Sequence, residues 1–110
     1  MQNERDDDPV LSAVTEQENL LVRARAGEAH IAVTDRRLVV ASRERKMLDV
    51  PIDGLRRIQF DIERQRPATL VLVPEEPSHE PQVLAVPPEE YAGVAEALVI
   101  LGRRLAGLSE

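Results

Sequence analysis

The 110-residue sequence contains no cysteine and no tryptophan, and it has one phenylalanine and one tyrosine. Without cysteine the chain has no disulfide framework, no thiolate metal site and no cysteine nucleophile, which is compatible with a reducing cytoplasm. Because Phe60 and Tyr91 are the only aromatic residues, the core must be built from Val, Leu, Ile and Ala. A chain of this length fits one domain with one hydrophobic core.

Long hydrophobic runs are also missing. The longest unbroken apolar run is residues 97–101, far shorter than the roughly 20 residues that a membrane-spanning helix needs. The first residues are acidic, whereas a secretory signal peptide begins with a basic segment followed by an apolar one. We therefore expect a soluble, cytoplasmic protein.

The net charge of −6 is distributed unevenly along the chain. Residues 23–66 hold 11 basic and 7 acidic side chains, which leaves 3 basic and 13 acidic side chains elsewhere. A mildly basic middle is typical of a solvated surface, because alternating strands place their outward positions in water. Residues 1–17 are acidic and include Asp6, Asp7 and Asp8. We expect them to form a mobile segment before a domain at 18–107.

The sequence up to residue 86 shows the two-residue alternation and the turn signals of seven antiparallel strands. The first break falls at Gly27, because glycine adopts a positive φ without steric cost. The second break falls at Asp35 and Arg36, between two apolar stretches. Arg36 and Arg37 are therefore predicted as hairpin residues and not as a binding site. The later breaks lie at 42–46, 53–54, 64–67 and 74–81.

Residues 88–106 repeat their apolar side chains at the period of an α-helix. Glu89 and Glu90 lie near its start, whereas Arg103 and Arg104 lie near its end, an order that suits the helix dipole. The helix is predicted to pack on the strands through one stripe: Tyr91, Val94, Ala95, Leu98, Leu101, Gly102 and Leu105.

Ile100 falls on the predicted outer face of this helix, about half a turn from Tyr91. A single exposed isoleucine is common and needs no explanation. However, Gly93 and Ala97 flank it on that face, and small residues allow a second helix to approach closely. Gly93, Ala97 and Ile100 are thus the candidate residues for self-association, in a two-fold contact between the helices of a homodimer.

Seven strands followed by an amphipathic helix are the elements of a pleckstrin-homology-like (PH-like) barrel. The stretch HIAVTDRRLVVAS at 30–42 is similar to the Thr-Asp-Arg-Arg-Leu hairpin of bacterial PH-like domains, and MLDVPIDGLRRIQFDIE at 47–63 resembles the strands that follow it. The resemblance covers about residues 18–106. It implies a mainly β fold of seven antiparallel strands in two near-orthogonal sheets, capped by the C-terminal helix.

The resemblance also implies binding rather than a reaction. Eukaryotic members often hold phosphoinositide head groups through Lys and Arg of the first hairpin, and others bind peptides. Here that hairpin offers Arg23 and Arg25, but its loop is short and carries Glu28 without a Lys-rich run. A second basic group is predicted in one turn, where it either meets an anionic partner or only solubilises a hairpin tip: Arg43, Arg45 and Lys46.

We therefore expect a non-catalytic binding or scaffolding module that presents loops or a sheet edge to a protein partner or to another copy of itself. The alternative is peripheral membrane association, in which the basic hairpins bind anionic lipid head groups. Nucleic acid is not expected as a partner, because the chain is acidic and its basic stretch lacks stacking aromatic residues apart from Phe60.

No catalytic, metal or cofactor site is predicted from the sequence. His30 and His79 lie far apart and lack the spacing of metal ligands. Glu75, Glu76 and Glu80 fall in a proline-rich loop, with no apolar pocket to separate their pKa values for acid and base chemistry. The sequence has no nucleophilic serine motif and no glycine-rich phosphate loop. We expect neither an enzyme nor a bound metal.

Overall fold

The computed structural model describes residue 10 and residues 14–62 and 67–107. Seven strands and a C-terminal helix are present, as predicted. In chain order the elements are β1 (Leu20–Ala26), β2 (Ala29–Thr34), β3 (Arg37–Ala41), β4 (Lys46–Pro51), the 3-10 turn η2 (Ile52–Gly54), β5 (Leu55–Asp61), β6 (Ala68–Pro74), β7 (Gln82–Val86), the 3-10 turn η3 (Pro88–Glu90) and α2 (Tyr91–Leu105).

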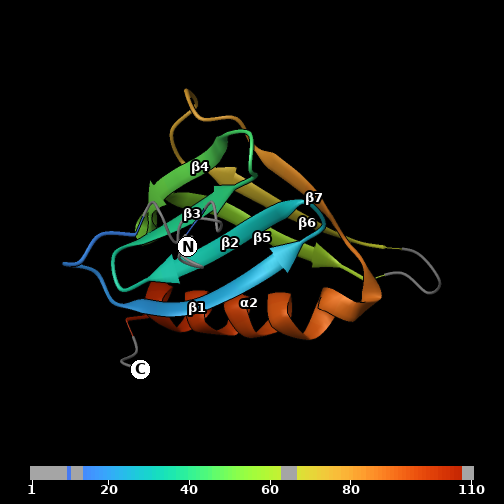
Figure 1. The fold of residues 1–110 in the computed structure, drawn as a ribbon. Coiled ribbons are helices and arrows are strands. Elements are labelled where there is room, and N and C mark those ends of the chain that lie inside the picture. The colour runs from blue at the N-terminus through green and yellow to red at the C-terminus, as the bar shows by residue number, and fades with distance from the viewer. Residues whose placement is uncertain (1–9, 11–13, 63–66, 108–110) are drawn as a thin grey trace.

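The strands form two antiparallel sheets with the orders β1-β2-β3-β4 and β5-β6-β7. The sheets cross one another, and α2 runs along their lower side in the view of Figure 1. Short turns link each strand to its neighbour in the first sheet. One of them consists of Asp35 and Arg36, because β2 ends at Thr34 and β3 begins at Arg37. The second predicted hairpin turn is therefore confirmed.

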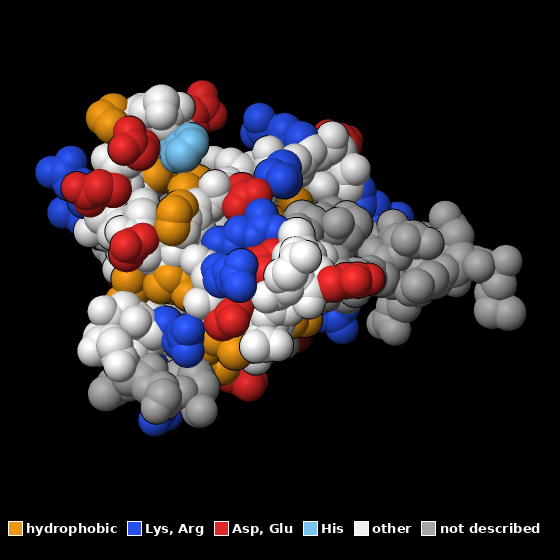
Figure 2. Space-filling model, turned by 90° about the vertical axis from the view of Figure 1, so that its left-hand side faces the viewer, with side chains coloured by type: hydrophobic (Ala, Val, Ile, Leu, Met, Phe, Trp, Pro, Cys, Tyr) orange, Lys and Arg blue, Asp and Glu red, His pale blue; other side chains and the backbone are white. Residues whose placement is uncertain are grey.

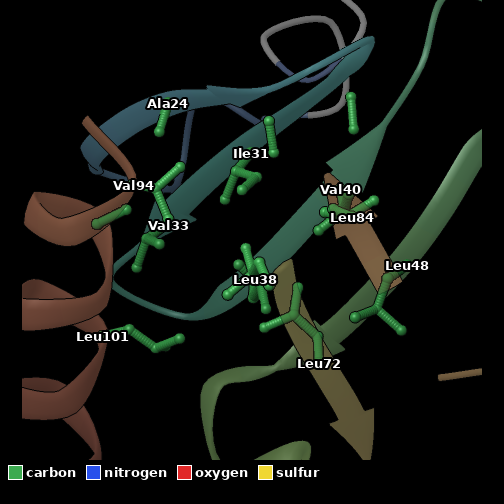
Figure 3. Packing of buried hydrophobic residues seen from close by; sticks show 14 of the residues in the cluster. Ala24, Ile31, Val33, Leu38, Val40, Leu48, Leu72, Leu84, Val94 and Leu101 are labelled. Atoms are coloured by element: carbon green, nitrogen blue, oxygen red, sulfur yellow. The ribbon is translucent and has the colours of Figure 1, made fainter. Parts of the chain in front are cut away.

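The core lies between the sheets and consists of aliphatic side chains, as the scarcity of aromatic residues requires. Leu38 of the first sheet lies beside Leu72 of the second, whereas Val33 lies closer to Val94 of α2 (Figure 3). Val94 and Leu101 of α2 close this core, and both are buried. Phe60 and Tyr91 pack edge to face at its border, with ring centroids 6.1 Å apart. One continuous core thus joins both sheets to the helix.

The predicted core-facing stripe of α2 is correct in part. Val94 and Leu101 are buried, and Tyr91 and Leu98 pack against the core. Ala95, Gly102 and Leu105 are exposed instead, whereas Ala97, which was predicted on the outer face, is buried. Small or apolar residues occur on more than one side of this helix, so its periodicity alone does not define the buried side. Packing against β1 and β2 decides which side faces the core.

The N-terminal residues that the structure describes belong to the domain. Val10 and Val14 are buried and form a second cluster with residues on the outer face of β2 and β3: Ala32, Val39 and Ala41. The predicted boundary at residue 18 therefore leaves out two packed side chains. Among the other residues of the predicted mobile segment, 15–17 are described, whereas 1–9 and 11–13 lie outside the described residues.

Candidate functional site

A groove of about 490 Å³ lies between β7 and the loops that connect β1 to β2 and β3 to β4. Ligand sites in proteins are commonly clefts of roughly 300–1,000 Å³, so this volume is adequate for a ligand. The two loops come from neighbouring hairpins of the first sheet, and β7 of the second sheet passes beside them (Figure 1). We call this space the hairpin groove. It is lined by Ala26, Gly27, Glu28, Ala29, Ser42, Glu44, Arg45, Met47, Val83, Leu84 and Ala85.

The hairpin groove combines an apolar floor with a charged rim. Ala26, Ala29 and Leu84 are buried side chains among its lining residues. Val83 is 67% exposed, the highest value among the large hydrophobic residues that the structure describes. The rim is formed by exposed charged residues of the two loops: Glu28, Glu44 and Arg45. Such a surface suits a ligand that has both apolar and polar groups.

Gly27 gives the groove its shape at one end. Its φ of 65° favours glycine, and a Cβ at this position would lie 3.1 Å from the main-chain oxygen of Ala85. Its N–H donates to Oε1 of Glu90 over 2.8 Å. The start of the C-terminal helical region therefore holds the first hairpin loop beside β7.

A smaller hollow of about 240 Å³ lies on the other side of the same loops. It shares Glu28, Ser42 and Glu44 with the hairpin groove, so these residues form the ridge between the two spaces. Its remaining lining residues are basic: Arg25, His30 and Arg43. A third hollow has a volume of about 440 Å³. Its lining includes the basic residues Arg23, Arg25 and His30 and the acidic residues Glu89 and Glu90.

The residues of the predicted basic cluster at the β3–β4 turn are all exposed. Arg43 lines the smaller hollow, and Arg45 lines the hairpin groove. Lys46 lies on β4, where its Nζ is 3.1 Å from Oδ2 of Asp49. These three residues thus differ in their neighbours.

The structure instead places Arg43 near the two arginines of the first strand. Arg25 and Arg43 line one hollow, and Arg23 and Arg25 line another. Arg25 already has an acidic neighbour, because its Nε lies 3.9 Å from Oε2 of Glu90. Its guanidinium also donates to the main-chain oxygen of Gly27 over 3.3 Å. Basic residues do converge here, but carboxylates accompany them.

The residues predicted for self-association do not form an outer stripe. Ala97 is 2% exposed and belongs to the core, and Ile100 packs against that core. A Cβ on Gly93 would lie 3.9 Å from the Cβ of Ala24 on β1. The residues proposed to contact a second helix therefore contact this chain's own first sheet or core. The prediction placed them on the wrong side of α2.

Arg37 has a structural role that its place in the predicted turn did not reveal. Its guanidinium lies 2.7 Å from Oε1 of Glu18 and 2.7 Å from Oδ2 of Asp49. The Thr34 hydroxyl donates to Oε2 of Glu18 over 2.9 Å and accepts the Arg36 and Arg37 main-chain N–H groups. We call Glu18, Thr34, Arg37 and Asp49 the turn network.

The turn network holds a nearly buried carboxylate in its charged form. The side chain of Glu18 is only 4% exposed. Hydrogen bonds from Arg37, assisted by the Thr15 N–H and the Thr34 hydroxyl, lower the pKa of Glu18 from 4.5 to about 2, although burial acts in the opposite direction. Glu18 in turn raises the pKa of the Arg37 guanidinium above its usual range. These charges are therefore engaged with one another within the fold.

Acidic and basic side chains alternate over short distances on the face that Figure 2 shows. They do not gather there into a field of one sign. Within the described part of the chain, no helix is long and apolar enough to cross a membrane. Three or more potential metal ligands come together nowhere in residues 14–62 and 67–107. His79 and its neighbouring glutamates are exposed in the β6–β7 loop, as the sequence indicated.

The main features of the hairpin groove were not predicted from the sequence. Glu28 was expected only to disfavour phosphate binding, and no role was predicted for Val83. The alternation in QVLAV does indicate that Val83 and Ala85 share an outward face. No local pattern, however, indicates that β7 passes beside two hairpin loops of the other sheet.

The comparisons with known proteins show the fold. No family profile and no curated protein matches the sequence. Among solved structures, the chain is similar to a pleckstrin homology domain from Shewanella amazonensis SB2B, with a TM-score of 0.65 and 16% sequence identity. The similarity covers 86% of this chain and 80% of that chain. The protein therefore has a PH-like fold, in agreement with the resemblance of its hairpin and strand pattern.

Proposed function

We propose that this protein is a non-catalytic binding module that receives a segment of a protein partner in the hairpin groove. The observation that carries this proposal is the exposed Val83 beside an apolar floor, within a groove of about 490 Å³. Contiguous apolar surface with a polar border is typical of protein interaction sites. The PH-like fold, whose members are generally binding modules, supports the same class of function.

The rim charges favour a protein segment over an anionic lipid head group. Two of the three charged residues on the rim are glutamates, Glu28 and Glu44. The basic residues nearby are partly engaged, because Arg25 lies beside Glu90 and Lys46 beside Asp49. A phosphate group entering this region would meet carboxylates as well as guanidinium groups. Membrane association therefore remains the alternative proposal, carried by Arg23, Arg25 and Arg43.

The groove lacks the arrangement that nucleophilic catalysis requires. Ser42 provides the hydroxyl group among its lining residues. That hydroxyl accepts the N–H of Glu44 over 3.3 Å and lies 3.5 Å from the main-chain oxygen of Arg45. It therefore closes its own turn, and no histidine lines the groove to act as its base. These contacts support binding rather than a reaction.

Site-specific photo-cross-linking in the native cell tests the proposed function. A photoreactive amino acid is placed at Val83 or, as a matched control, at Val99, which is 60% exposed on α2. We expect Val83 to yield one major protein adduct that the control position does not yield. Equal adducts at both positions, or none at Val83, would contradict the proposal.

A vesicle experiment tests the membrane alternative directly. The purified protein is sedimented with vesicles of phosphatidylcholine alone or with added phosphatidylserine at low salt. Binding that rises with phosphatidylserine and is lost when Arg23, Arg25 and Arg43 are replaced by glutamine would favour the membrane alternative. We expect no such binding.

A further inference from the structure

Strand β7 has one flank that no other strand of the described residues pairs with. It lies at the edge of its sheet and pairs on its inner side with β6. Its pairs include Thr69 with Ala85 and Val71 with Val83. In antiparallel pairs, residues alternate between those that exchange hydrogen bonds with the neighbour and those whose N–H and C=O point outward. The direction of one main-chain group therefore determines the directions of the others.

The contact with Gly27 gives the direction of Ala85. A Cβ on Gly27 would lie 3.1 Å from the main-chain oxygen of Ala85, and Gly27 belongs to the first hairpin, not to β6. The Ala85 carbonyl therefore points away from β6. Because Val83 lies two residues earlier, its N–H and C=O point the same way. Among the described residues, no main-chain hydrogen bond outside the ladders involves Val83.

The outward side of β7 is thus closed at one residue and open at another. Gly27 covers the carbonyl of Ala85, whereas Val83 lines the hairpin groove with its side chain exposed. An exposed donor and acceptor on one edge residue can pair with an extended chain, as occurs when peptides add to a sheet edge.

We propose that the partner segment binds in extended form, exchanges main-chain hydrogen bonds with Val83, and places a lysine or arginine beside Glu28 and Glu44. This inference rests on the proposed function and adds the chemistry of the partner. Glu28 and Glu44 line the groove from two different hairpins. Neither forms an ion pair within the described part of the chain. Arg45, on the same rim, is outnumbered by these two carboxylates.

Two synthetic peptides test the charge preference. Both have acetyl and amide ends, and their sequences are Ser-Val-Lys-Val-Ser and Ser-Val-Asp-Val-Ser. Binding to the full-length protein is followed by amide NMR shifts at millimolar peptide concentrations. We expect the lysine peptide to shift Gly27, Val83 and Ala85 and to bind at least threefold more tightly than the aspartate peptide. Equal binding, tighter binding of the aspartate peptide, or no binding of either peptide would overturn the proposal.

Two variants of one residue test the main-chain pairing. Val83→Pro removes the outward N–H without removing a ladder bond, because proline is tolerated on edge strands where its nitrogen faces solvent. Val83→Ala removes most of the side chain and keeps the N–H. We expect Val83→Pro to weaken the binding of the lysine peptide about tenfold, and Val83→Ala to weaken it less than threefold. Retained protection of the Leu84 and Val86 amides from hydrogen exchange would establish that β7 remains paired in both variants.

The charge contact has its own variant. Glu28→Gln keeps the shape of the rim. We expect it to weaken the binding of the lysine peptide about threefold and not to weaken the binding of the aspartate peptide. Failure of the edge proposal differs from failure of the proposed function. A specific cellular adduct at position 83, together with unweakened binding of the lysine peptide to the Val83→Pro variant, would support the binding function and reject main-chain pairing. Absence of the adduct would reject the function itself.

Discussion

The two ends of the first sheet use their charged side chains differently. At the end with the β2–β3 turn, Glu18, Arg37 and Asp49 form a chain of ion pairs with 2.7 Å contacts. At the end with the β1–β2 and β3–β4 loops, Glu28 and Glu44 stay exposed beside the hairpin groove. Both ends are built from short turns with similar residue types. We infer that burial by an added segment turns a charged turn into a stabilising element.

The added segment at the first end is the N-terminal stretch. Val10 and Val14 cover the outer face of β2 and β3, and Glu18 enters the turn from the same stretch. At the other end, β7 passes beside the loops but leaves a groove. We therefore expect the first end to contribute to stability, and we propose the second as the binding end. The following predictions test this division.

The largest expected effect comes from removing Arg37. Arg37→Ala leaves the nearly buried carboxylate of Glu18 without its main partner, so we expect the free energy of unfolding to fall by roughly 3 kcal/mol. Urea denaturation measures this change. Arg36→Ala is the control, because it changes the neighbouring turn residue and should cost less than about 0.5 kcal/mol. Equal effects of the two variants would show that the turn network contributes no more than the exposed turn.

The second-largest effect is expected from acid, which should lower the contribution of the turn network to the free energy of unfolding. The pKa of Glu18 is about 2 in the folded protein and 4.5 without its partners. Its contribution is complete above pH 4.5 and is lost as the pH falls toward 2, because the unfolded chain takes up the proton first. Between pH 6 and pH 3 we expect a loss of roughly 2 kcal/mol from this residue. Glu18→Gln should flatten the measured pH dependence by that amount, and an unchanged slope would contradict the assignment.

Gly27 offers an intermediate effect at the groove end. Gly27→Ala places a Cβ at a φ of 65° and 3.1 Å from the oxygen of Ala85, so we expect a loss of about 1 kcal/mol. Gly102→Ala is the matched control in α2, where a Cβ meets nothing within 4 Å. That variant should gain up to about 1 kcal/mol. Thermal melting of both proteins compares the signs, and a stabilised Gly27→Ala would contradict the close approach of β7.

The smallest effect is expected from the rim of the hairpin groove. Glu28→Gln and Arg45→Gln remove exposed charges for which no ion pair is found among the described residues. Each should change the free energy of unfolding by less than about 0.5 kcal/mol. Urea denaturation under the conditions used for Arg37→Ala makes the values comparable. A loss above 1 kcal/mol in either variant would mean that the groove end is also structural.

Local patterns predicted most of the fold and little of the candidate site. The Asp35–Arg36 turn and the alternation around Ile58 and Phe60 depend on neighbouring residues, so they could be read from the chain. The role of Arg37 could not, because its partners Glu18 and Asp49 are 19 and 12 residues away. For the same reason, the sequence does not show that Arg43, Arg45 and Lys46, which are close in the chain, have different neighbours in the fold.

The seven strands, the C-terminal helix, the aliphatic core and the lack of cysteine chemistry could be predicted from the sequence, because they follow from composition and from periods of two and 3.6 residues. Tertiary packing determines which side of α2 is buried, where Val10 and Val14 pack, and that β7 borders two hairpin loops. Each of these depends on surfaces brought together from distant parts of the chain. The burial of Ala97 and the position of Val83 beside two hairpin loops are therefore properties of the assembled barrel, since neither residue's sequence neighbours specify what lies opposite it.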